Sequence, residues 1–405
     1  MGGTGSRLSE DIATLGRIGR VGRTGVSRIA WSPEHLEASR WLVGELRALG
    51  LDAGIDAAGN VIGRWEAGDG LAVLVGSHLD SVVLGGRYDG TYGVLAGLAA
   101  LRTLREEGFA PRRPIWLAAW MDEEGARFGW TFLGSRAFAG DDLEKLAGRL
   151  DEGGQTLREV VGDWGLDFDR IGAARALDRV GQYLELHIEQ GPVLDRRGID
   201  LGIVTAIVGL RCFRAAMVGA ANHAGTTPMS MRRDALAGAA RAAVALRDLA
   251  HSRGDMTANV GVMRAEPGGI NIVPGRAEFT IDVRSADADV AAGLGGIVED
   301  TLAAIASDES LGLELEELIA LAPVPMDAAL QEALERACEG EGATSMRMPS
   351  GAGHDAMILG TRVPAGMLFV PSDGGVSHSP DEHTSPEHCD LGVRVLVRTL
   401  RELAG

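Results

Sequence analysis

The stretch LAVLVGSHLDSVVLGGRYDGTYGVLAGLAALRTLREEGFAPRRPIWLAAWMDEEG, residues 71–125, decides the fold. It contains two short apolar runs and, between them, a segment with helical spacing of apolar residues over 91–108. A strand, a helix and a second strand in this order predict an open α/β sheet. Such a sheet binds its ligands in the crevice outside the carboxyl ends of its strands. Because His78 and the pair Glu123 and Glu124 directly follow the apolar runs, we expect these side chains in that crevice.

Further acid and imidazole side chains occur at strand ends and in Gly-rich turns. They are Asp80 in GSHLDS, Asp89 in GGRYDG, His187 in ELHIEQGP and His378 in GGVSHSP. Imidazoles, a carboxylate that can bridge two cations and a pair of adjacent glutamates are the components of a two-metal hydrolytic site. In such a pair, one carboxylate binds metal while its neighbour transfers protons. The set as a whole predicts metal-assisted hydrolysis.

Each of these residues also has an ordinary structural explanation. His78, taken alone, is better explained as a hydrogen-bonded core histidine, and His187 suits the edge of a core. Asp89 is well suited to cap the helix that follows it. Asp80 lies two residues after His78, on the same face of an extended segment, so we expect its carboxylate to accept the other ring N–H of His78. The order and contexts of the whole set favour the metal site over these explanations.

The composition limits the class of protein. With 405 residues, 45% of them hydrophobic, the chain is long enough for two domains with a large core. Its net charge of −18 argues against a nucleic-acid partner or an anionic membrane surface. The N-terminal segment has no apolar signal core and the longest apolar runs are too short to span a bilayer, so we expect a soluble cytoplasmic protein. Cys212, Cys338 and Cys389 form no CxxC pair, and we expect free thiols in a reducing compartment.

The order of predicted elements indicates two domains. Residues 32–50 have the pattern of an amphipathic helix capped by Ser32, and a strand pair follows. Over 209–321 the order is strand, helix, strand, strand, helix, strand, which is the ferredoxin-like pattern. We therefore predict an α+β domain at 209–321, inserted into a discontinuous α/β domain that comprises 1–208 and 322–405 and has a central mixed sheet.

Several polar residues outside this set are candidate substrate contacts. His223, in ANHAGTTPM, follows a predicted strand and is a candidate donor to an oxyanion. Arg284, in IDVRS, is able to hold a substrate carboxylate with two parallel hydrogen bonds, and an ion pair with a nearby acid explains it equally well. Asn271, in GGINIVPG, is a candidate contact or only a turn residue. The GAGHD turn presents backbone N–H groups suited to an anion. The remaining candidates are Gln190, Gly353 and His354.

Together, the motifs resemble the hydantoinase/carbamoylase amidases. The resemblance is carried by GSHLDSV, GGRYDGTYGV, DEEGARFG with LGSRA, ELHIEQGP, ANHAGTTPM, NIVPG with IDVRS, GAGHDA and VPSDGGVSHSPDE, which cover nearly the whole chain. The family comprises N-carbamoyl-L-amino acid hydrolases, β-ureidopropionases and allantoate or ureidoglycine amidohydrolases. It belongs to a wider clan of di-zinc aminoacylases and carboxypeptidases that shares the HxD and EE elements, whereas ELHIEQGP and HAGTTPM are specific to this branch.

The resemblance implies a role for each candidate residue. It makes Glu123 the general base and Asp89 the bridge between two cations, with the five metal ligands being His78, Asp89, Glu124, His187 and His378. His383 and His388 lie so close to His378 that spacing alone does not choose among them. The resemblance favours His378, which precedes an SPDE run, and His383 stands where the family usually has an aromatic residue.

The resemblance also implies the roles of the inserted domain. There, His223, Asn271 and Arg284 match residues that bind the carboxylate and the oxyanion of the substrate. In the clan the counterpart of His223 reaches into the site of a partner subunit, so the resemblance implies a homodimer formed through this lid domain. Two divalent cations per chain are implied, with zinc first and manganese or cobalt as alternatives.

The implied reaction is hydrolysis of the carbamoyl C–N bond of N-carbamoyl-L-amino acids or related ureido acids. Water would be activated at the metal pair with Glu123 as the base. Allantoate amidohydrolase and β-ureidopropionase activities are open alternatives, and so is a catalytically inactive binding protein on the same scaffold. A peptidase-like aminoacylase is disfavoured because His187 stands where the peptidases usually carry an acid.

Overall fold

The computed structural model describes residues 4–405 and divides into two compact units. The first unit comprises the chain up to Thr205, then Pro325–Met348 and Ala352–Gly405, and the second comprises Ala206–Val324 and Pro349–Gly351. The sequence-based prediction placed the inserted domain at 209–321. Each unit has its own sheet and its own buried core.

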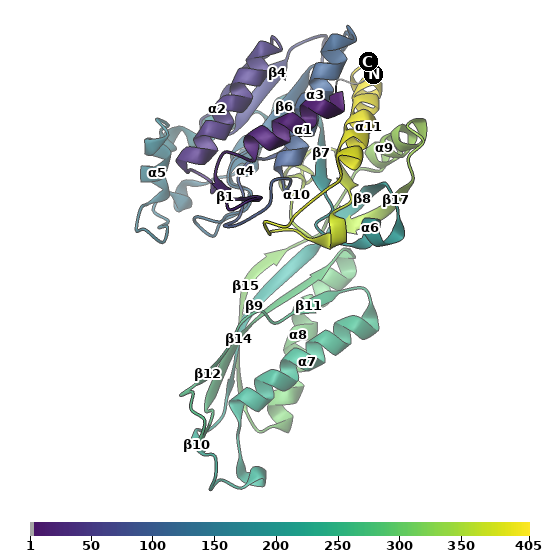
Figure 1. Ribbon diagram of the computed structural model, residues 1–405. Coiled ribbons are helices and arrows are strands. Elements are labelled where there is room, and N and C mark those ends of the chain that lie inside the picture. The colour runs from purple at the N-terminus through teal and green to yellow at the C-terminus, as the bar shows by residue number, and fades with distance from the viewer. Residues whose placement is uncertain (1–3) are drawn as a thin grey trace. The chain divides into compact units, whose positions relative to one another are not determined.

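A nine-stranded mixed sheet forms the centre of the first unit (Figure 1). Its strands, in sheet order, are β16 (Val324–Pro325), β8 (Leu201–Ile207), β18 (Ala365–Val370), β7 (Val180–Ile188), β5 (Ala72–His78), β6 (Ile115–Trp120), β4 (Val61–Trp65) and β3 (Asp52–Ile55), with β17 (Ser345–Ser350) paired to β8. The central strands β18, β7, β5 and β6 are parallel, and β8, β4 and β3 run antiparallel to their neighbours. The prediction of an α/β fold with a central mixed sheet is confirmed.

Helices cover this sheet and explain its apolar strands. Every residue of β5 and β6 is buried. A parallel strand whose two faces are both covered is apolar along its length, which explains the two apolar runs in the sequence. The helix predicted over 32–50 begins as expected, with the Ser32 hydroxyl accepting from the His35 N–H at 3.1 Å. The longer helices of the unit are α1 (Thr4–Leu15), α2 (Pro33–Ala48), α3 (Thr91–Glu106), α9 (Ala328–Gly340) and α11 (Pro386–Ala404). The shorter ones are α4 (Leu133–Ala139), α5 (Leu157–Asp163), α6 (Val193–Arg197) and α10 (Ala356–Leu359).

The parallel strands bring the candidate site residues to one edge. His78 is the last residue of β5 and pairs in register with Trp120, the last residue of β6. His187 lies at the end of β7, which is also parallel to β5. The carboxyl ends of parallel strands meet at the same edge of a sheet, so His78, His187 and the glutamate pair that follows β6 converge there.

The second unit has the predicted ferredoxin-like order. Its sheet runs β11 (Thr257–Asn259), β14 (Arg276–Ser285), β9 (Gly209–Val218) and β15 (Gly312–Leu321), with β12 (Met263–Glu266) also paired to β14. Helices α7 (Ala235–Arg253) and α8 (Ala288–Asp308) pack on one face of this sheet (Figure 1). The segment predicted as one strand, TANVGVMRAEP, is two short strands, β11 and β12.

Alternate residues of β14 and one side of α8 build the core of the second unit. Phe279 and Ile281 of β14 are buried, as are Leu294, Val298 and Leu302 of α8. Among the described helices, α8 alone is long and apolar enough to cross a membrane by length and composition. A core helix of a packed domain passes the same test, so this is weak evidence for a membrane span. The three cysteines of the chain are free thiols, as predicted.

Candidate metal centre

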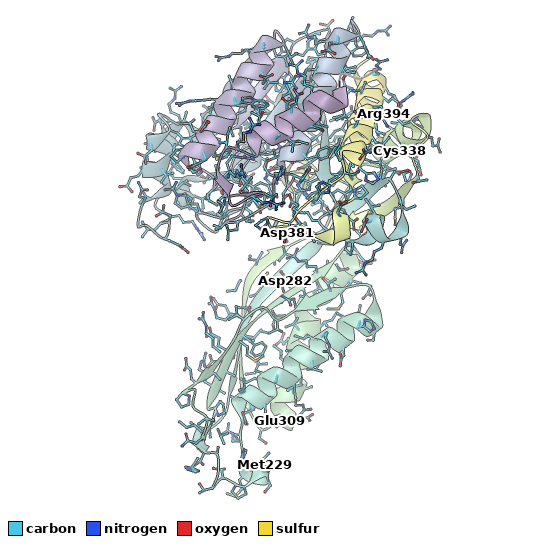
Figure 2. The ribbon with its side chains drawn as sticks, viewed as in Figure 1. Met229, Asp282, Glu309, Cys338, Asp381 and Arg394 are labelled. Carbon is cyan, nitrogen blue, oxygen red and sulfur yellow. The ribbon has the colours of Figure 1, made fainter. Side chains whose placement is uncertain are left out.

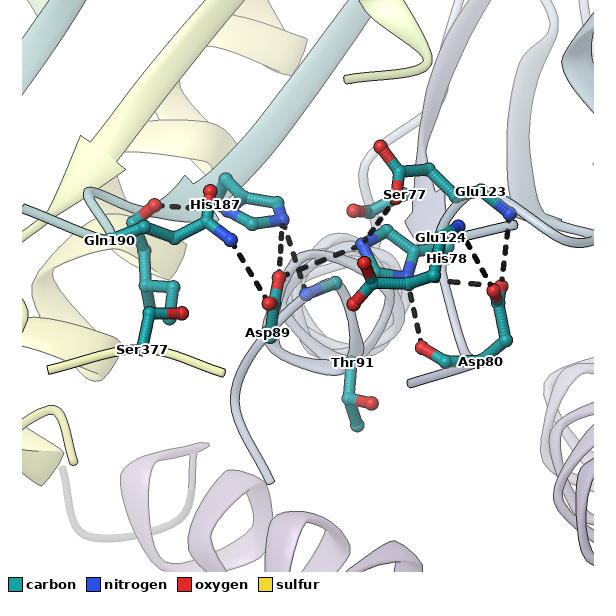
Figure 3. Close-up of polar contacts among 12 residues, drawn as sticks. Ser77, His78, Asp80, Asp89, Thr91, Glu123, Glu124, His187, Gln190 and Ser377 are labelled. Carbon is teal, nitrogen blue, oxygen red and sulfur yellow. Dashed lines mark hydrogen bonds and ion pairs between the residues drawn. The ribbon is translucent and has the colours of Figure 1, made fainter. Parts of the chain in front are cut away.

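Two buried imidazoles present the same ring nitrogen to the site. His78 Nδ1 lies 3.0 Å from the carbonyl oxygen of Asp80, and His187 Nδ1 lies 2.9 Å from that of Ile188. A carbonyl only accepts hydrogen bonds, so each Nδ1 carries a proton, and in the neutral ring the lone pair is on Nε2. The Nε2 atom of His187 also lies 3.1 Å from the Gly90 N–H. Both Nε2 atoms face the Oδ1 atom of Asp89, at 3.7 Å for His78 and 3.2 Å for His187 (Figure 3). Hydrogen bonds of this kind orient imidazoles that ligate metals.

The Asp89 carboxylate lies between the imidazoles. Its Oδ1 faces His78 and His187, and its Oδ2 lies 3.1 Å from His378 Nε2. Although burial opposes it, the His187 and His378 imidazoles beside the carboxylate hold the pKa of Asp89 well below its usual range. The alternative of Asp89 as a helix cap is wrong, because Gly90 occupies the N-cap of α3 and no side chain caps that helix.

Gly90 brings the Asp89 loop close to His78. Its backbone has a φ of +59°, and a Cβ atom at this position would lie 2.3 Å from the His78 ring. Only glycine combines this backbone conformation with that approach. The glycine in GGRYDG therefore has a direct role in the geometry of the site.

Asp80 positions the glutamate pair. Its Oδ1 accepts from the Glu123 N–H at 3.3 Å and its Oδ2 from the Glu124 N–H at 3.1 Å (Figure 3). The expectation that the Asp80 carboxylate accepts the ring N–H of His78 is wrong, since the two lie 3.8 Å apart and the Asp80 carbonyl accepts that hydrogen bond instead. The Asp80 side chain thus fixes the backbone of both glutamates and makes no hydrogen bond to His78.

The donor atoms of the site group in sets that suit a pair of cations. Three sets have their ligand atoms within 4.8 Å of one another: His78, Asp89 and His187; His78, Glu123 and Glu124; Asp89, Glu124 and His378. Glu124 Oε1 is buried and has no hydrogen-bond partner within the described residues. Burial, with the charges of neighbouring carboxylates, raises the pKa of Glu123 and of Glu124 well above the usual range. A buried group of carboxylates with an unpartnered oxygen, faced by the Nε2 atoms of imidazoles, fits divalent cations.

The C-terminal tail brings one of its three histidines to the site. His378 Nε2 lies 3.1 Å from Asp89 Oδ2 and 3.7 Å from Glu124 Oε2, and its side chain is 51% exposed. His383 instead pairs with Asp373, and His388 with the Ser385 hydroxyl. Of the three, His378 is therefore the one in position to bind a cation.

Gln190 and His354 also lie beside these groups. Gln190 Nε2 donates to Asp89 Oδ2 at 3.0 Å, from a backbone with a φ of +58°. His354 is buried, and its ring lies 4.5 Å from the His187 ring. Next to it, Gly353 packs against Phe132, where a Cβ atom would lie 2.8 Å from the ring. The structure thus places Gln190 at the Asp89 carboxylate and His354 against a candidate ligand.

In the second unit, His223 and Asn271 lie on one two-stranded ribbon. It is formed by β10 (Asn222–His223) and β13 (Ile272–Val273), and the Asn271 carbonyl accepts from the Ala224 N–H at 2.8 Å. The N–H groups of Gly225 and Thr226 donate to His223 Nδ1 at 3.0 and 3.2 Å. A neutral His223 therefore carries its proton on Nε2, which makes this exposed imidazole a hydrogen-bond donor.

Arg284 forms the ion pair that was the alternative to a substrate contact. Its Nε and Nη2 donate to the two oxygens of Asp282 at 2.8 and 2.9 Å, and its Nη1 donates to the Gly351 carbonyl at 2.8 Å. A guanidinium has five N–H donors, so these three contacts hold Arg284 in place and leave two donors available.

Arg28 lies beside the site, and no pattern in the sequence distinguishes it. It is buried and donates to the Leu79 carbonyl at 2.6 Å, the Leu15 carbonyl at 2.9 Å and the Thr91 hydroxyl at 2.7 Å. It thereby joins the segment after β5 to the first turn of α3. An arginine in TGVSR looks like a surface residue, and only long-range contacts identify it as buried.

We expect the substitution Asp80→Asn to weaken metal binding about 10- to 100-fold, the usual cost of losing an outer partner of a metal site. An asparagine has one acceptor oxygen, so one of the two N–H groups of the glutamate pair would face an NH₂ group. Calorimetric titration of the metal-free protein measures the effect, and Asp52→Asn, at an exposed position of β3, is the control. Unchanged affinity in Asp80→Asn would show that the hydrogen bonds to Asp80 do not position the pair.

Comparisons with known proteins agree with this geometry. The model of peptidase family M20/M25/M40 matches residues 74–402. The chain is 41% identical over 403 residues to an N-carbamoyl-L-amino acid amidohydrolase of Geobacillus stearothermophilus, covering 99% of this chain and 98% of that protein. It is 38% identical over 384 residues to an allantoate amidohydrolase of Bacillus subtilis, covering 94% and 93%. A solved structure of a hydantoinase/carbamoylase family amidase from Burkholderia multivorans superimposes with a TM-score of 0.91 at 36% identity, covering 99% of this chain and 98% of that one.

Proposed function

The chain belongs to peptidase family M20/M25/M40 and to its hydantoinase/carbamoylase amidases, and from this premise we propose that it hydrolyses the carbamoyl C–N bond of N-carbamoyl-L-amino acids or related ureido acids. It is a hydrolase of carbon–nitrogen bonds other than peptide bonds. The observation that carries the proposal is the group of imidazoles and carboxylates around Asp89. An inactive binding protein would not need Glu123 beside a complete set of metal ligands.

Two groups of side chains would hold the cations. We assign one cation to His78, Asp89 and His187, and the other to Asp89, Glu124 and His378. Of the three sets, these two share Asp89 and leave Glu123 free for proton transfer. When bound, the two cations polarise the carbamoyl oxygen and make a nearby water more acidic. Zinc is the first choice, and manganese or cobalt fits the same ligand types.

Glu123 transfers the proton. Its Oε2 lies 3.8 Å from His78 Nε2, next to the proposed cations, and its backbone N–H is fixed by Asp80. Without cations, burial and the charge of Glu124 raise the pKa of Glu123. A general base works best when its pKa lies near the working pH, above the range of an exposed glutamate. The carboxylate takes a proton from the attacking water and delivers it to the leaving nitrogen. For a carbamoyl amino acid, the products are the amino acid, ammonia and carbon dioxide.

Two ends of the second unit supply the other proposed contacts. We assign the substrate carboxylate to Arg284 and the developing oxyanion to His223, with Asn271 beside it. Arg284 lies near one end of β14, and Arg276 begins the other end, close to the ribbon that carries His223. The eight residue steps from Arg276 to Arg284 span about 27 Å of extended strand. A small ureido acid cannot touch both ends, so we propose that His223 comes from the partner in a homodimer.

The assay that tests the proposed function measures ammonia release by the metal-loaded protein. The substrates are N-carbamoyl-L-amino acids, their D-isomers, N-carbamoyl-β-alanine and allantoate, the last because a relative at 38% identity is named an allantoate amidohydrolase. We expect turnover of an L-carbamoyl acid or of allantoate, and turnover lower by at least about 100-fold in Glu123→Gln protein prepared in parallel. Ammonia release from none of the four would contradict the proposal.

The substitution Arg284→Lys should raise KM for ureido acids far more than for the matching amides. A lysine keeps the charge but loses the planar fork, and a hydrogen bond to a charged group is worth about 1.5–3 kcal/mol. Steady-state kinetics on an acid and its amide measures the difference. Equal losses on the two substrates would show that Arg284 serves only its ion pair with Asp282.

A further inference from the structure

Glu382 connects two loops of the metal centre that are far apart in sequence. Its Oε1 accepts from the N–H groups of Tyr88 and Asp89 at 2.9 and 3.0 Å. Its Oε2 accepts from the Ser377 hydroxyl at 3.0 Å. One carboxylate thus holds the backbone of the bridging residue Asp89 and the residue directly before His378.

The surroundings of Glu382 are shaped around this carboxylate. Glu382 is buried, at 4% exposure, although it lies in the C-terminal tail that also carries the exposed Asp381 (Figure 2). At Gly86, a Cβ atom would lie 2.1 Å from Glu382 Oε1 and 2.5 Å from Glu382 Cβ. The loop before Asp89 therefore has no side chain at the point where Glu382 enters.

The ligands beside Glu382 need such a connection. His378 has a φ of +52°, a conformation that a histidine rarely adopts and that its surroundings must maintain. Its side chain is half exposed, so core packing does not hold it in place. Asp89 serves both proposed cations, whereas His378 serves only the one that it shares with Glu124.

We propose that Glu382 is a positioning residue that couples the Asp89 loop to the His378 tail and thereby sets the affinity for the cation held by Asp89, Glu124 and His378. This inference rests on the metal pair of the proposed function and not on its substrate. The contacts of Glu382 use both of its oxygens as acceptors from neutral donors, so its geometry rather than its charge carries the effect.

The test is a titration of metal-free protein with Co²⁺, followed by calorimetry and by visible absorption, without substrate. Wild type should bind two Co²⁺ per chain. In Glu382→Ala, the first should bind as in wild type and the second about 10- to 100-fold more weakly. Glu382→Gln keeps an acceptor oxygen for Tyr88 and Asp89, and its NH₂ group can donate to Ser377, so it should restore the second site.

Gly86→Ala provides an independent way to break the same contact. Its backbone lies outside the region that requires glycine, so the added methyl group acts by displacing Glu382. We expect the same selective loss of the second Co²⁺, and no further loss when Gly86→Ala is combined with Glu382→Ala. Glu387→Ala, at an exposed acid in the first turn of α11, is the control and should match wild type.

Three outcomes would overturn the inference: wild-type binding of the second Co²⁺ by both Glu382→Ala and Gly86→Ala, equal weakening of both sites, or a loss in Glu382→Gln as large as in Glu382→Ala. If wild type itself bound no Co²⁺, the metal centre of the proposed function would be wrong. If wild type bound two and the variants did too, only the coupling role of Glu382 would be wrong.

Discussion

The variant Glu123→Gln should fold, bind its metals and lose turnover. A glutamine has nearly the same shape as Glu123 and keeps the backbone N–H that Asp80 accepts, but its amide cannot take a proton from water. General-base catalysis typically contributes about 10²- to 10⁴-fold, and we expect kcat to fall by that factor. Ammonia release and elemental analysis on the same preparation measure the two effects together.

The neighbouring position gives the matched control. Glu124→Gln should lower metal content, because Glu124 is assigned as a ligand whose Oε1 has no other partner in the described chain. The two variants differ by one position on the same loop, so a general disturbance of that loop would affect both alike. A Glu123→Gln protein with near wild-type kcat would show that another group is the base.

The variant His223→Ala should lower kcat by about 10²- to 10³-fold, the usual cost of losing one oxyanion donor, without changing metal content. His223 lies on the β10–β13 ribbon, and its Nδ1 already accepts two backbone N–H groups. Its free Nε2–H is suited to stabilise negative charge that develops only in the transition state.

A mixture of two inactive variants tests where His223 acts. His223→Ala and Glu123→Gln chains are dissociated, combined and reassociated, and a mixed dimer then has one site with both residues intact and one with neither. With random pairing, activity should return to about a quarter of wild type. If mass analysis showed mixed dimers and the mixture stayed inactive, His223 would act within its own chain or not at all.

Local sequence patterns were sufficient to predict the main strands and helices and the fold class. The continuous apolar runs of β5 and β6 identified buried parallel strands, and strand-end positions then placed His78 and the glutamate pair at one edge. The order of elements in the second unit was likewise predicted, because apolar residues are spaced differently in strands and in helices. Such features depend on residues that are neighbours in sequence, so one sequence is enough to recognise them.

Contacts between segments that are far apart in sequence could not be predicted from local patterns. Arg28 and its partner Thr91 are 63 residues apart, and no local pattern distinguishes this arginine from an exposed one. The role of Asp80 was mistaken because the carbonyl and the carboxylate of one residue compete for the same ring N–H, and only the backbone conformation decides between them. The Arg284 ion pair did have a signal, since Asp282 and Arg284 are two apart on a strand and share a face.

The most direct test of the two-metal account is one titration of metal-free protein with Mn²⁺ or Zn²⁺ in the presence of the best ureido substrate, with ammonia release recorded at each addition. The account predicts no activity before metal is added and an increase that ends at two equivalents per chain, because both assigned sites share Asp89 and both are needed. Full activity without metal, or a plateau at one equivalent or fewer, would contradict it.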